Sequence, residues 1–288
     1  MLIRPSLLLN LFVAVVMFSI GLRVSGAELL NVLRDRALFV RTLLANCFLI
    51  PAVGFLLVHA FPLTPETKIG ILLLAAIPGT PIALQFTRQA KTRLAFAAAL
   101  TFVLSVVSIA MTPLATEVIP ESVQRNQRPI LLLVTNIALY IALPLCAGVL
   151  AARHAPKVAP RLELPLGLLA SVVFVWESRL VRAQAFNAIR GGGAILAMLL
   201  LLLLSMLIGW LIGGPDPESR RVLATSTSMR SVVVVLYVAR YCFPGTDIYM
   251  VPIVYLSLMI PTNLAFNLAF AGWHKLRRKE RRGRSATK

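Results

Sequence analysis

The stretch TSTSMRS at residues 225–231 is the most informative part of this chain. Six of its seven residues are polar, yet it lies inside a segment, 221–240, that is long and apolar enough to cross a membrane. A charge at the centre of a bilayer costs roughly 2.5–3.5 kcal/mol on insertion scales. Arg230 is therefore expected to face protein or water, and solvation by the neighbouring hydroxyls with no further role is the simplest alternative.

A second apolar segment, 69–87, is interrupted by Pro78-Gly79-Thr80-Pro81. The prolines remove two backbone donors and clash with the preceding turn, and glycine permits unusual backbone angles between them. The pattern predicts a discontinuous helix whose ends point at a solute, with a packing kink as the alternative. Unbroken helix through the middle of this segment would contradict the prediction.

The composition places the whole chain in a membrane. Of its 288 residues, 58% are hydrophobic and 14% are charged, whereas soluble domains have about 45–50% apolar and about 25% charged residues. The net charge of +18 does not indicate nucleic-acid binding, because the basic residues stand between apolar runs and in the tail 275–288. This distribution is typical of the positive-inside rule.

We expect an all-α, polytopic membrane protein with one transmembrane domain, residues 1–288. Windows of about 20 apolar residues predict nine spans, near 5–22, 38–60, 69–87, 94–116, 129–151, 162–178, 192–213, 221–240 and 248–273. The first is interpreted as a retained span rather than a cleaved signal. Most loop Lys and Arg residues, including Arg220 and Arg221, then share one side with the basic tail. This predicts an inner-membrane protein with a cytoplasmic C-terminus.

The two interrupted spans run in opposite directions in this topology. Interrupted spans at corresponding places in two inverted halves indicate the midplane site of a secondary transporter. The halves are unequal, with a first repeat of about 5–118 and a second of about 129–274.

Several short stretches resemble the motifs of one transporter family. They are Met17-Phe18-Ser19-Ile20-Gly21-Leu22 (resembling MFxMGL), Asn46-Cys47-Phe48-Leu49-Ile50-Pro51 (QFxLMP), Ile77-Pro78-Gly79-Thr80 with Ala90-Lys91 (CPGG…AxGD), Thr112-Pro113 (TP) and Arg221 to Ser231 (RTxAxExGxQN). In order and spacing the chain is similar to the bile acid:sodium symporter superfamily. The resemblance implies inverted five-helix repeats, of which the first lacks a helix here. It also implies two crossed discontinuous helices, a rocking panel of other helices, and organic anions as substrates.

The departures from this family concern sodium. The resemblance places the family's sodium-binding acid on Ser226, its glutamines on Arg230 and Asn46, and its asparagines on Ser231 and Leu84. Arginine remains charged and offers no acceptor, so we do not expect a sodium site of the usual kind. A carboxylate could instead pair with Arg230 in a bidentate manner.

The sequence therefore predicts a secondary transporter of a small organic anion that works by alternating access. The candidate substrate-binding residues are Arg230, Ser226, Thr227, Ser231, Thr80, Pro78, Gly79, Asn46, Gln85 and Thr112. The alternatives are a decayed site that no longer transports, and a membrane sensor or assembly component whose basic tail is the functional part. Retention of uptake after removal of the tail would distinguish the last of these.

An enzyme, a cofactor and a resident metal are not expected. Cys47, Cys146 and Cys242 lie far apart and form no metal-ligand spacing. Glu177 stands near a predicted membrane end without a second acid or base at helical spacing.

Overall fold

The computed structural model describes residues 5–22, 36–79, 94–117, 135, 138–155, 159, 161–162, 165–166, 172, 182–189 and 191–286. Every regular element in this part of the chain is helical. The elements are α1 (Pro5–Gly21), α3 (Arg36–Leu44), η1 (Ala45–Leu49), α4 (Ile50–Ala60), α5 (Pro65–Ala76), α7 (Leu94–Glu117), η2 (Ala138–Ala142), α9 (Leu143–His154), α11 (Ala194–Ile212), α12 (Pro217–Ser228), α13 (Val232–Cys242), η3 (Asp247–Tyr249) and α14 (Met250–Ala286).

Neither interrupted span is one continuous helix in the described part of the chain. Helix α5 ends at Ala76, and the backbone is extended at Ile77 (φ −101°, ψ 98°). Gly79 then adopts a φ of +78°, which residues with a Cβ rarely adopt. The prediction that unbroken helix does not run through Pro78-Gly79 is thus confirmed, and residues 80–87 of the predicted span lie outside the described part of the chain. In the other span, α12 ends at Ser228, Met229 is extended (φ −86°, ψ 99°), and α13 begins at Val232.

The half-helices α5 and α12 are built to the same plan. Each has 12 residues, begins with proline, and has glutamate as its second residue. In α5 the backbone N–H of Thr67 donates to Oγ1 of the N-cap Thr64, at 3.3 Å. In α12 the N–H of Ser219 donates to Oδ2 of the N-cap Asp216, at 3.0 Å. These caps satisfy backbone donors that the first turn leaves free.

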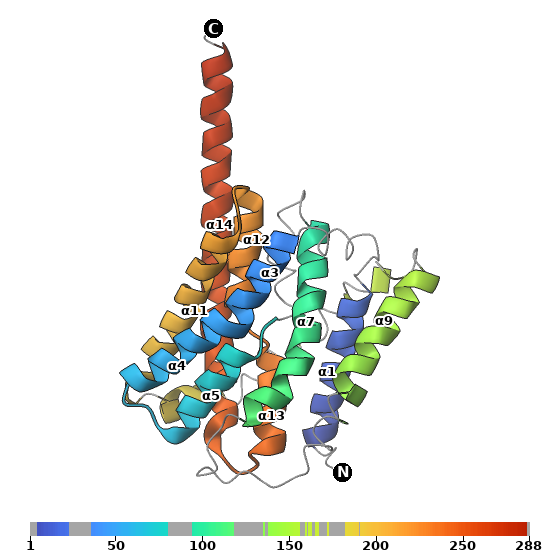
Figure 1. Cartoon of the computed structure of the whole chain (residues 1–288), viewed down its shortest axis with the longest axis vertical. Helices are drawn as coiled ribbons and strands as arrows, with labels where there is room; N and C mark the ends of the chain where they lie inside the picture. The colour runs from blue at the N-terminus through green and yellow to red at the C-terminus, as the bar shows by residue number, and fades with distance from the viewer. Residues whose placement is uncertain are drawn as a thin grey trace.

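The two half-helices enter the bundle from opposite ends and stop in its middle (Figure 1). Twelve residues span about 18 Å as α-helix, which is little more than half of a hydrocarbon core of about 30 Å. Each half-helix is therefore long enough to reach the midplane and too short to cross. The two breaks consequently lie at a similar depth.

A glycine on the preceding helix allows each half-helix to pack closely. A Cβ on Gly54 of α4 would collide with the Cβ of Ala75, and one on Gly209 of α11 would collide with Thr227. Ala75 and Thr227 stand at the same position in α5 and α12, two residues before the extended residue that follows each helix. The hairpins α4–α5 and α11–α12 therefore share their mode of packing as well as their caps.

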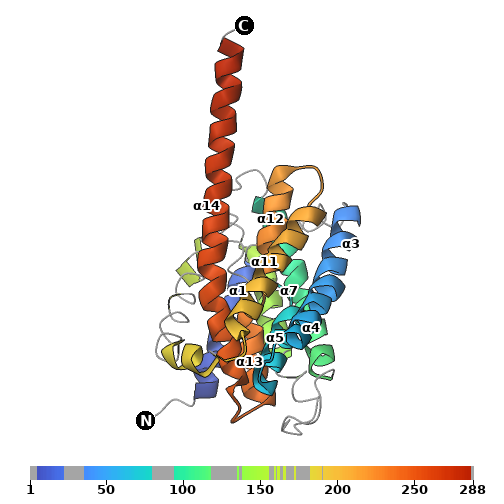
Figure 2. The same cartoon turned by 90° about the vertical axis from the view of Figure 1, so that its left-hand side faces the viewer.

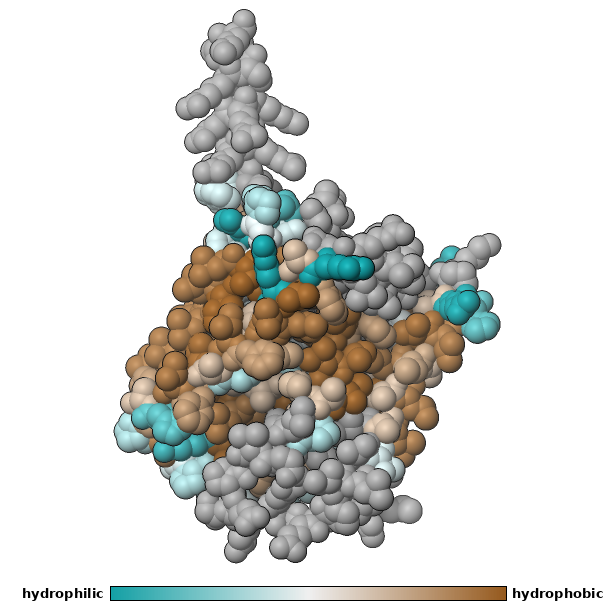
Figure 3. Space-filling view, viewed as in Figure 1, coloured by the Kyte–Doolittle hydropathy of each residue, from teal (hydrophilic) through white to brown (hydrophobic). Residues whose placement is uncertain are grey.

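Among the described candidate spans, the second broken span is the most completely buried. Every residue from Arg221 to Ala239 is buried. Outer helices expose large apolar side chains instead, including Phe48, Leu56 and Leu211. Figure 3 shows a broad apolar band over the described surface, with hydrophilic residues above and below it. This arrangement fits a protein whose flanks contact lipid and whose centre is shielded from it.

The described helices agree with much of the predicted span pattern. Four helical stretches are long and apolar enough to cross a membrane, namely Arg36–Ala60, Ala194–Ile212, Pro217–Cys242 and Asp247–Trp273. Helices α1 and α7 coincide with two further predictions. Span 129–151 is described from residue 135 onward with a gap at 136–137, and most of 162–178 lies outside the described residues.

One detail differs from the sequence prediction. Arg221 was expected at the boundary of the span 221–240 and was counted with the loop residues on the side of the basic tail, but α12 begins at Pro217 and Arg221 is 2% exposed within it. This difference arises because hydropathy places the boundary of a span at a charged residue even where protein groups surround it. The last predicted span, 248–273, agrees with the apolar stretch Asp247–Trp273. Beyond it, α14 continues as helix to Ala286 and extends past the rest of the bundle (Figures 1 and 2).

Replacing Gly209 by alanine should destabilise the protein. The new Cβ would lie 2.6 Å from the carbonyl oxygen of Leu223 and 2.8 Å from the Cα of Ala224, so the α11–α12 hairpin must separate. Gly272→Ala is the matched control, because nothing lies within 4 Å of a Cβ there. Overpacking of this kind costs about 1–3 kcal/mol, and thermal unfolding in detergent measures it. Equal melting temperatures for the two variants would contradict this packing.

Candidate functional site

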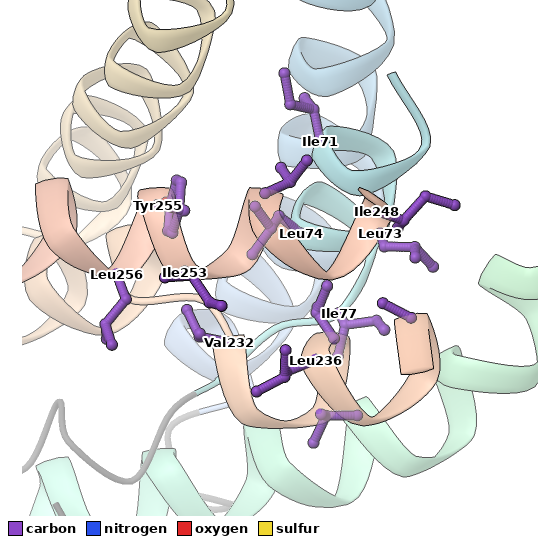
Figure 4. Close-up of a cluster of buried hydrophobic side chains, with 14 of the residues drawn as sticks. Ile71, Leu73, Leu74, Ile77, Val232, Leu236, Ile248, Ile253, Tyr255 and Leu256 are labelled. Carbon is purple, nitrogen blue, oxygen red and sulfur yellow. The ribbon is translucent and has the colours of Figure 1, made fainter. Parts of the chain in front are cut away.

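The two breaks meet in the middle of the bundle. The backbone N–H of Ser231, after α12, donates to the carbonyl oxygen of Ile77, after α5, at 3.4 Å. Figure 4 shows Leu74 and Ile77 from the first broken span close to Val232 and Leu236 from the second, with Tyr255 of α14 beside them. Residues more than 150 positions apart in sequence are thus joined at one point.

Arg230 binds the carbonyl end of α5. Its Nε donates to the carbonyl oxygen of Leu74 at 2.7 Å, and its Nη2 donates to that of Ala75. A helix that stops leaves its last four carbonyl groups without intrahelical donors, and in hydrocarbon each such group costs several kcal/mol. The carbonyl of Leu73 accepts from the N–H of Ile77. The guanidinium therefore satisfies the next two and places a positive charge at the negative end of the helix dipole.

Asn46 provides the third contact of the guanidinium. Nη1 of Arg230 donates to Oδ1 of Asn46 at 2.8 Å, and Nδ2 of Asn46 donates to the carbonyl oxygen of Thr42 at 3.0 Å. Asn46 lies in η1, a π-helical turn between α3 and α4. Such turns are rare and are frequently found at functional sites. The amide is therefore fixed at both of its ends.

Neutral groups satisfy the second break. The hydroxyl of Tyr255 donates to the carbonyl oxygen of Ser228 at 2.9 Å, and the hydroxyl of Ser228 lies 2.9 Å from Oδ1 of Asn263. Both partners belong to α14. Tyr255 was not among the residues predicted from the sequence, although a tyrosine hydroxyl buried in a membrane span usually has a hydrogen-bond partner.

The positive charge of Arg230 has neutral partners in the described structure. Its three recorded acceptors are two carbonyl groups and an amide, and the residue is 0% exposed. The glutamates of α5 and α12, Glu66 and Glu218, stand in the first turns of those helices, away from the breaks. Of the five N–H groups of a guanidinium, one on each terminal nitrogen remains for a further acceptor.

The other candidate residues divide into three groups. Ser226 and Ser231 are buried beside the break, and Oγ of Ser226 has no hydrogen-bond partner in the described part of the chain. The hydroxyl of Thr227 donates to the backbone carbonyl oxygens of Ser205 and Leu223. The hydroxyl of Thr112 donates to the carbonyl oxygen of Ser108. Pro78 and Gly79 form the first break, whereas Thr80 and Gln85 lie outside the described residues.

A comparison with known families identifies the type of protein. The model of the Sodium Bile acid symporter family matches residues 10–210, well over half of the chain. The chain belongs to this family. No curated protein matches it significantly by sequence. The sodium bile acid symporter family consists of membrane transporters rather than enzymes, and the apolar helices agree with a multi-pass membrane protein.

The family match covers Asn46 and the first break and ends at residue 210, before α12 begins. The segment that carries Ser226, Arg230 and Ser231 lies outside the matched residues. Within the described residues, no group of three or more His, Cys, Asp or Glu side chains is placed to hold a metal ion.

Replacing Arg230 by leucine should destabilise this family member strongly. The carbonyl groups of Leu74 and Ala75 would lose their donors, and each unsatisfied buried group costs about 1–3 kcal/mol. Arg230→Gln retains an N–H₂ group, so it should unfold at a temperature between those of the wild type and the leucine variant. Arg240→Leu is the control, because Arg240 is an exposed arginine of the same span. Melting curves in detergent that do not separate Arg230→Leu from Arg240→Leu would exclude the capping role.

Proposed function

We propose that this chain is a secondary transporter of a small organic anion, working by alternating access, without the sodium site usual in its family. One observation carries the proposal: the guanidinium of Arg230 lies at the meeting point of two broken helices and is paired with neutral oxygens alone among its recorded partners. A broken-helix crossover is where secondary transporters bind their solutes. A charge at that point determines which solutes are attracted.

The same oxygens explain why sodium is not expected. The carbonyls of Leu74 and Ala75 and the amide oxygen of Asn46 are neutral acceptors suited to a cation, and Arg230 already fills them. A second cation 4 Å from the guanidinium would meet a repulsion of about 4 kcal/mol at an effective dielectric constant of 20. Ser226, the nearby substitute for the family's acid, has a hydroxyl without charge. Arg230 thus acts as a tethered cation.

An anion has the opposite preference. The remaining N–H groups on the two terminal nitrogens of Arg230 match the two oxygens of a carboxylate. Arg230 is fully buried in this conformation, so access requires an opening of the bundle, as alternating access provides. Ser226, with its unpartnered hydroxyl, would supply a donor to the bound anion. Thr227, Ser231, Pro78 and Gly79 would shape the surroundings.

The proposed architecture is two inverted repeats, about 5–118 and 129–274, with nine spans. The shared caps, lengths, exit angles and glycine contacts of α5 and α12 support it. The opposite directions of these half-helices in Figure 1 also agree with inversion. We place the basic end of α14 in the cytoplasm and the protein in the inner membrane, because of the positive-inside distribution. Residues 1–288 then form one transmembrane domain.

Arg230→Gln should weaken anion binding at least about tenfold, because charge-assisted hydrogen bonds contribute roughly 1.5–3 kcal/mol each. Asn46→Asp is a sharper test, since it retains an acceptor for Nη1 but supplies an internal carboxylate that neutralises the guanidinium. It should lose anion binding while Arg230 is still present. A thermal-shift screen of monocarboxylates, keto acids and bile acids on purified protein identifies a ligand for titration.

The control for these two variants is Arg240→Gln, which removes an exposed charge from the same span. Its affinity should equal that of the wild type. If Arg230→Gln and Asn46→Asp are folded and bind the identified anion as the wild type does, Arg230 belongs to the structure alone and the proposed site is refuted.

Binding and uptake of that anion should be insensitive to sodium. Replacing sodium by potassium at constant ionic strength and membrane potential should change the wild-type rate by less than about twofold, because the tethered cation excludes a mobile one. The double variant Arg230→Gln with Ser226→Glu removes the tethered charge and adds a carboxylate, so sodium should stabilise it in thermal unfolding. A steep rise of wild-type uptake with external sodium would refute the tethered-cation interpretation.

A further inference from the structure

A second buried arginine lies in the same span, near the start of α12. Arg221 is 2% exposed. Its Nε donates to Oδ1 of Asn267 on α14 at 2.8 Å, and its guanidinium lies over the ring of Phe270, with Cζ 5.1 Å from the ring centroid. An amide on one edge and an aromatic face below therefore fix the plane of this guanidinium, and both groups come from α14.

The contact of Arg221 with its counter-ion is incomplete. Nη1 lies 3.7 Å from Oε2 of Glu218, one turn earlier in α12. This separation is short enough for an ion pair but too long for a hydrogen bond. Within the described structure, Nη2 of Arg221 and Oε2 of Glu218 are both buried without a hydrogen-bond partner. A bidentate carboxylate would satisfy both terminal nitrogens, and the short tether between Glu218 and Arg221 does not provide one.

We propose that Arg221 is a second carboxylate-binding site, with Glu218 as an internal ligand that an incoming carboxylate displaces. This inference rests on the proposed function, since the transported anion would be the natural occupant. An external carboxylate would give Nη2 a hydrogen-bond partner and would give Nη1 a closer partner than Glu218. Asn267 and Phe270 would keep the guanidinium in place while Glu218 swings away.

The site is accessible in a way that Arg230 is not. The side chain of Glu218 is 27% exposed, against 3% for Arg221, so the displaced carboxylate has water to move into. Glu218 follows directly after the proline that begins α12, at the end of the bundle from which α14 projects (Figures 1 and 2). An anion can therefore exchange with Glu218 from that end without first crossing the apolar core.

Polar groups connect this site with the crossover. Nδ2 of Asn267 donates to Oγ1 of Thr225. Asn263, one turn earlier in α14, accepts a hydrogen bond from the hydroxyl of Ser228. From Arg221 to Ser228 the α12 axis rises about 10 Å, and Arg230 follows two residues later. The seam between α12 and α14 thus has a cation near each end and neutral amides and hydroxyls between them, which suits an anion moving between two binding sites.

Chemical rescue by formate tests the site without requiring transport. Glu218→Ala leaves the guanidinium of Arg221 without a counter-ion and makes room for a small carboxylate. Its melting temperature in detergent should rise by at least about 2 °C more in sodium formate than in sodium chloride of equal ionic strength. Glu66→Ala is the matched control, because Glu66 occupies the equivalent position in α5, where the residue one turn later is Ile69 rather than arginine.

The formate response should be absent from Glu66→Ala and should be lost when Arg221→Lys is added to Glu218→Ala, because a lysine has no planar fork. Saturation-transfer NMR of formate on Glu218→Ala and Glu66→Ala gives a readout that does not depend on the double variant folding. Equal formate effects in those two single variants would overturn the proposal. If formate stabilises Glu218→Ala but anion binding does not depend on Arg230, the Arg221 site is supported and the proposed function is rejected. If anion binding depends on Arg230 but formate has no effect on Glu218→Ala, the proposed function is supported and the Arg221 site is rejected.

Discussion

The contact between Arg230 and the carbonyl groups of Leu74 and Ala75 is the interaction on which the rest of the structure depends. A helix that ends inside a bilayer leaves carbonyl groups that water cannot reach. The cost must be met by donors from elsewhere in the protein, and they must come from an element at the same depth. The second broken span satisfies both conditions, since its own break lies beside the first. Each break thus determines where the other can be.

The two breaks solve the same problem with different chemistry. The first has a charged donor with three recorded contacts, whereas the second uses the hydroxyl of Tyr255 and the side chains of α14. Hydroxyls and amides would satisfy carbonyl groups equally well, so capping alone does not require a charge. A buried ion with neutral partners alone is costly. That cost is the physical reason to expect that the charge of Arg230 serves a ligand as well as α5.

Local chemistry in the sequence predicted the break at Pro78-Gly79, because proline and glycine impose their geometry wherever they stand. The burial of Arg230 was also predictable, from the cost of a charge in lipid. Its partners were not, since the carbonyl groups of Leu74 and Ala75 carry no side-chain signal, and every residue has such a group. Asn46 was named through a motif, but its contact with Arg230 spans 184 positions in the chain, and no periodicity in the sequence encodes that pairing.

The start of the helix before Arg221 was not predicted, for a different reason. Hydropathy places the boundary of the span at the charged residues Glu218, Arg220 and Arg221, although Asp216 and Pro217 already begin a helix there. The signal that could have corrected this is the spacing of Asn263 and Asn267, four residues apart on one face of α14. Two amides on an otherwise apolar helix require polar partners opposite, and α12 presents Arg221, Thr225 and Ser228 at matching intervals.

These intervals bear on how an anion could move through the protein. A single strong cationic site would hold an anion tightly and release it slowly, since passage requires binding that is weak enough to leave. Two arginines on one span divide the attraction. Three N–H groups of Arg230 are already occupied by neutral acceptors, and Glu218 offsets part of the charge of Arg221. In the proposed transport cycle, this internal competition would lower the affinity of each arginine for an anion without removing its preference for anions, which is the balance that repeated turnover needs.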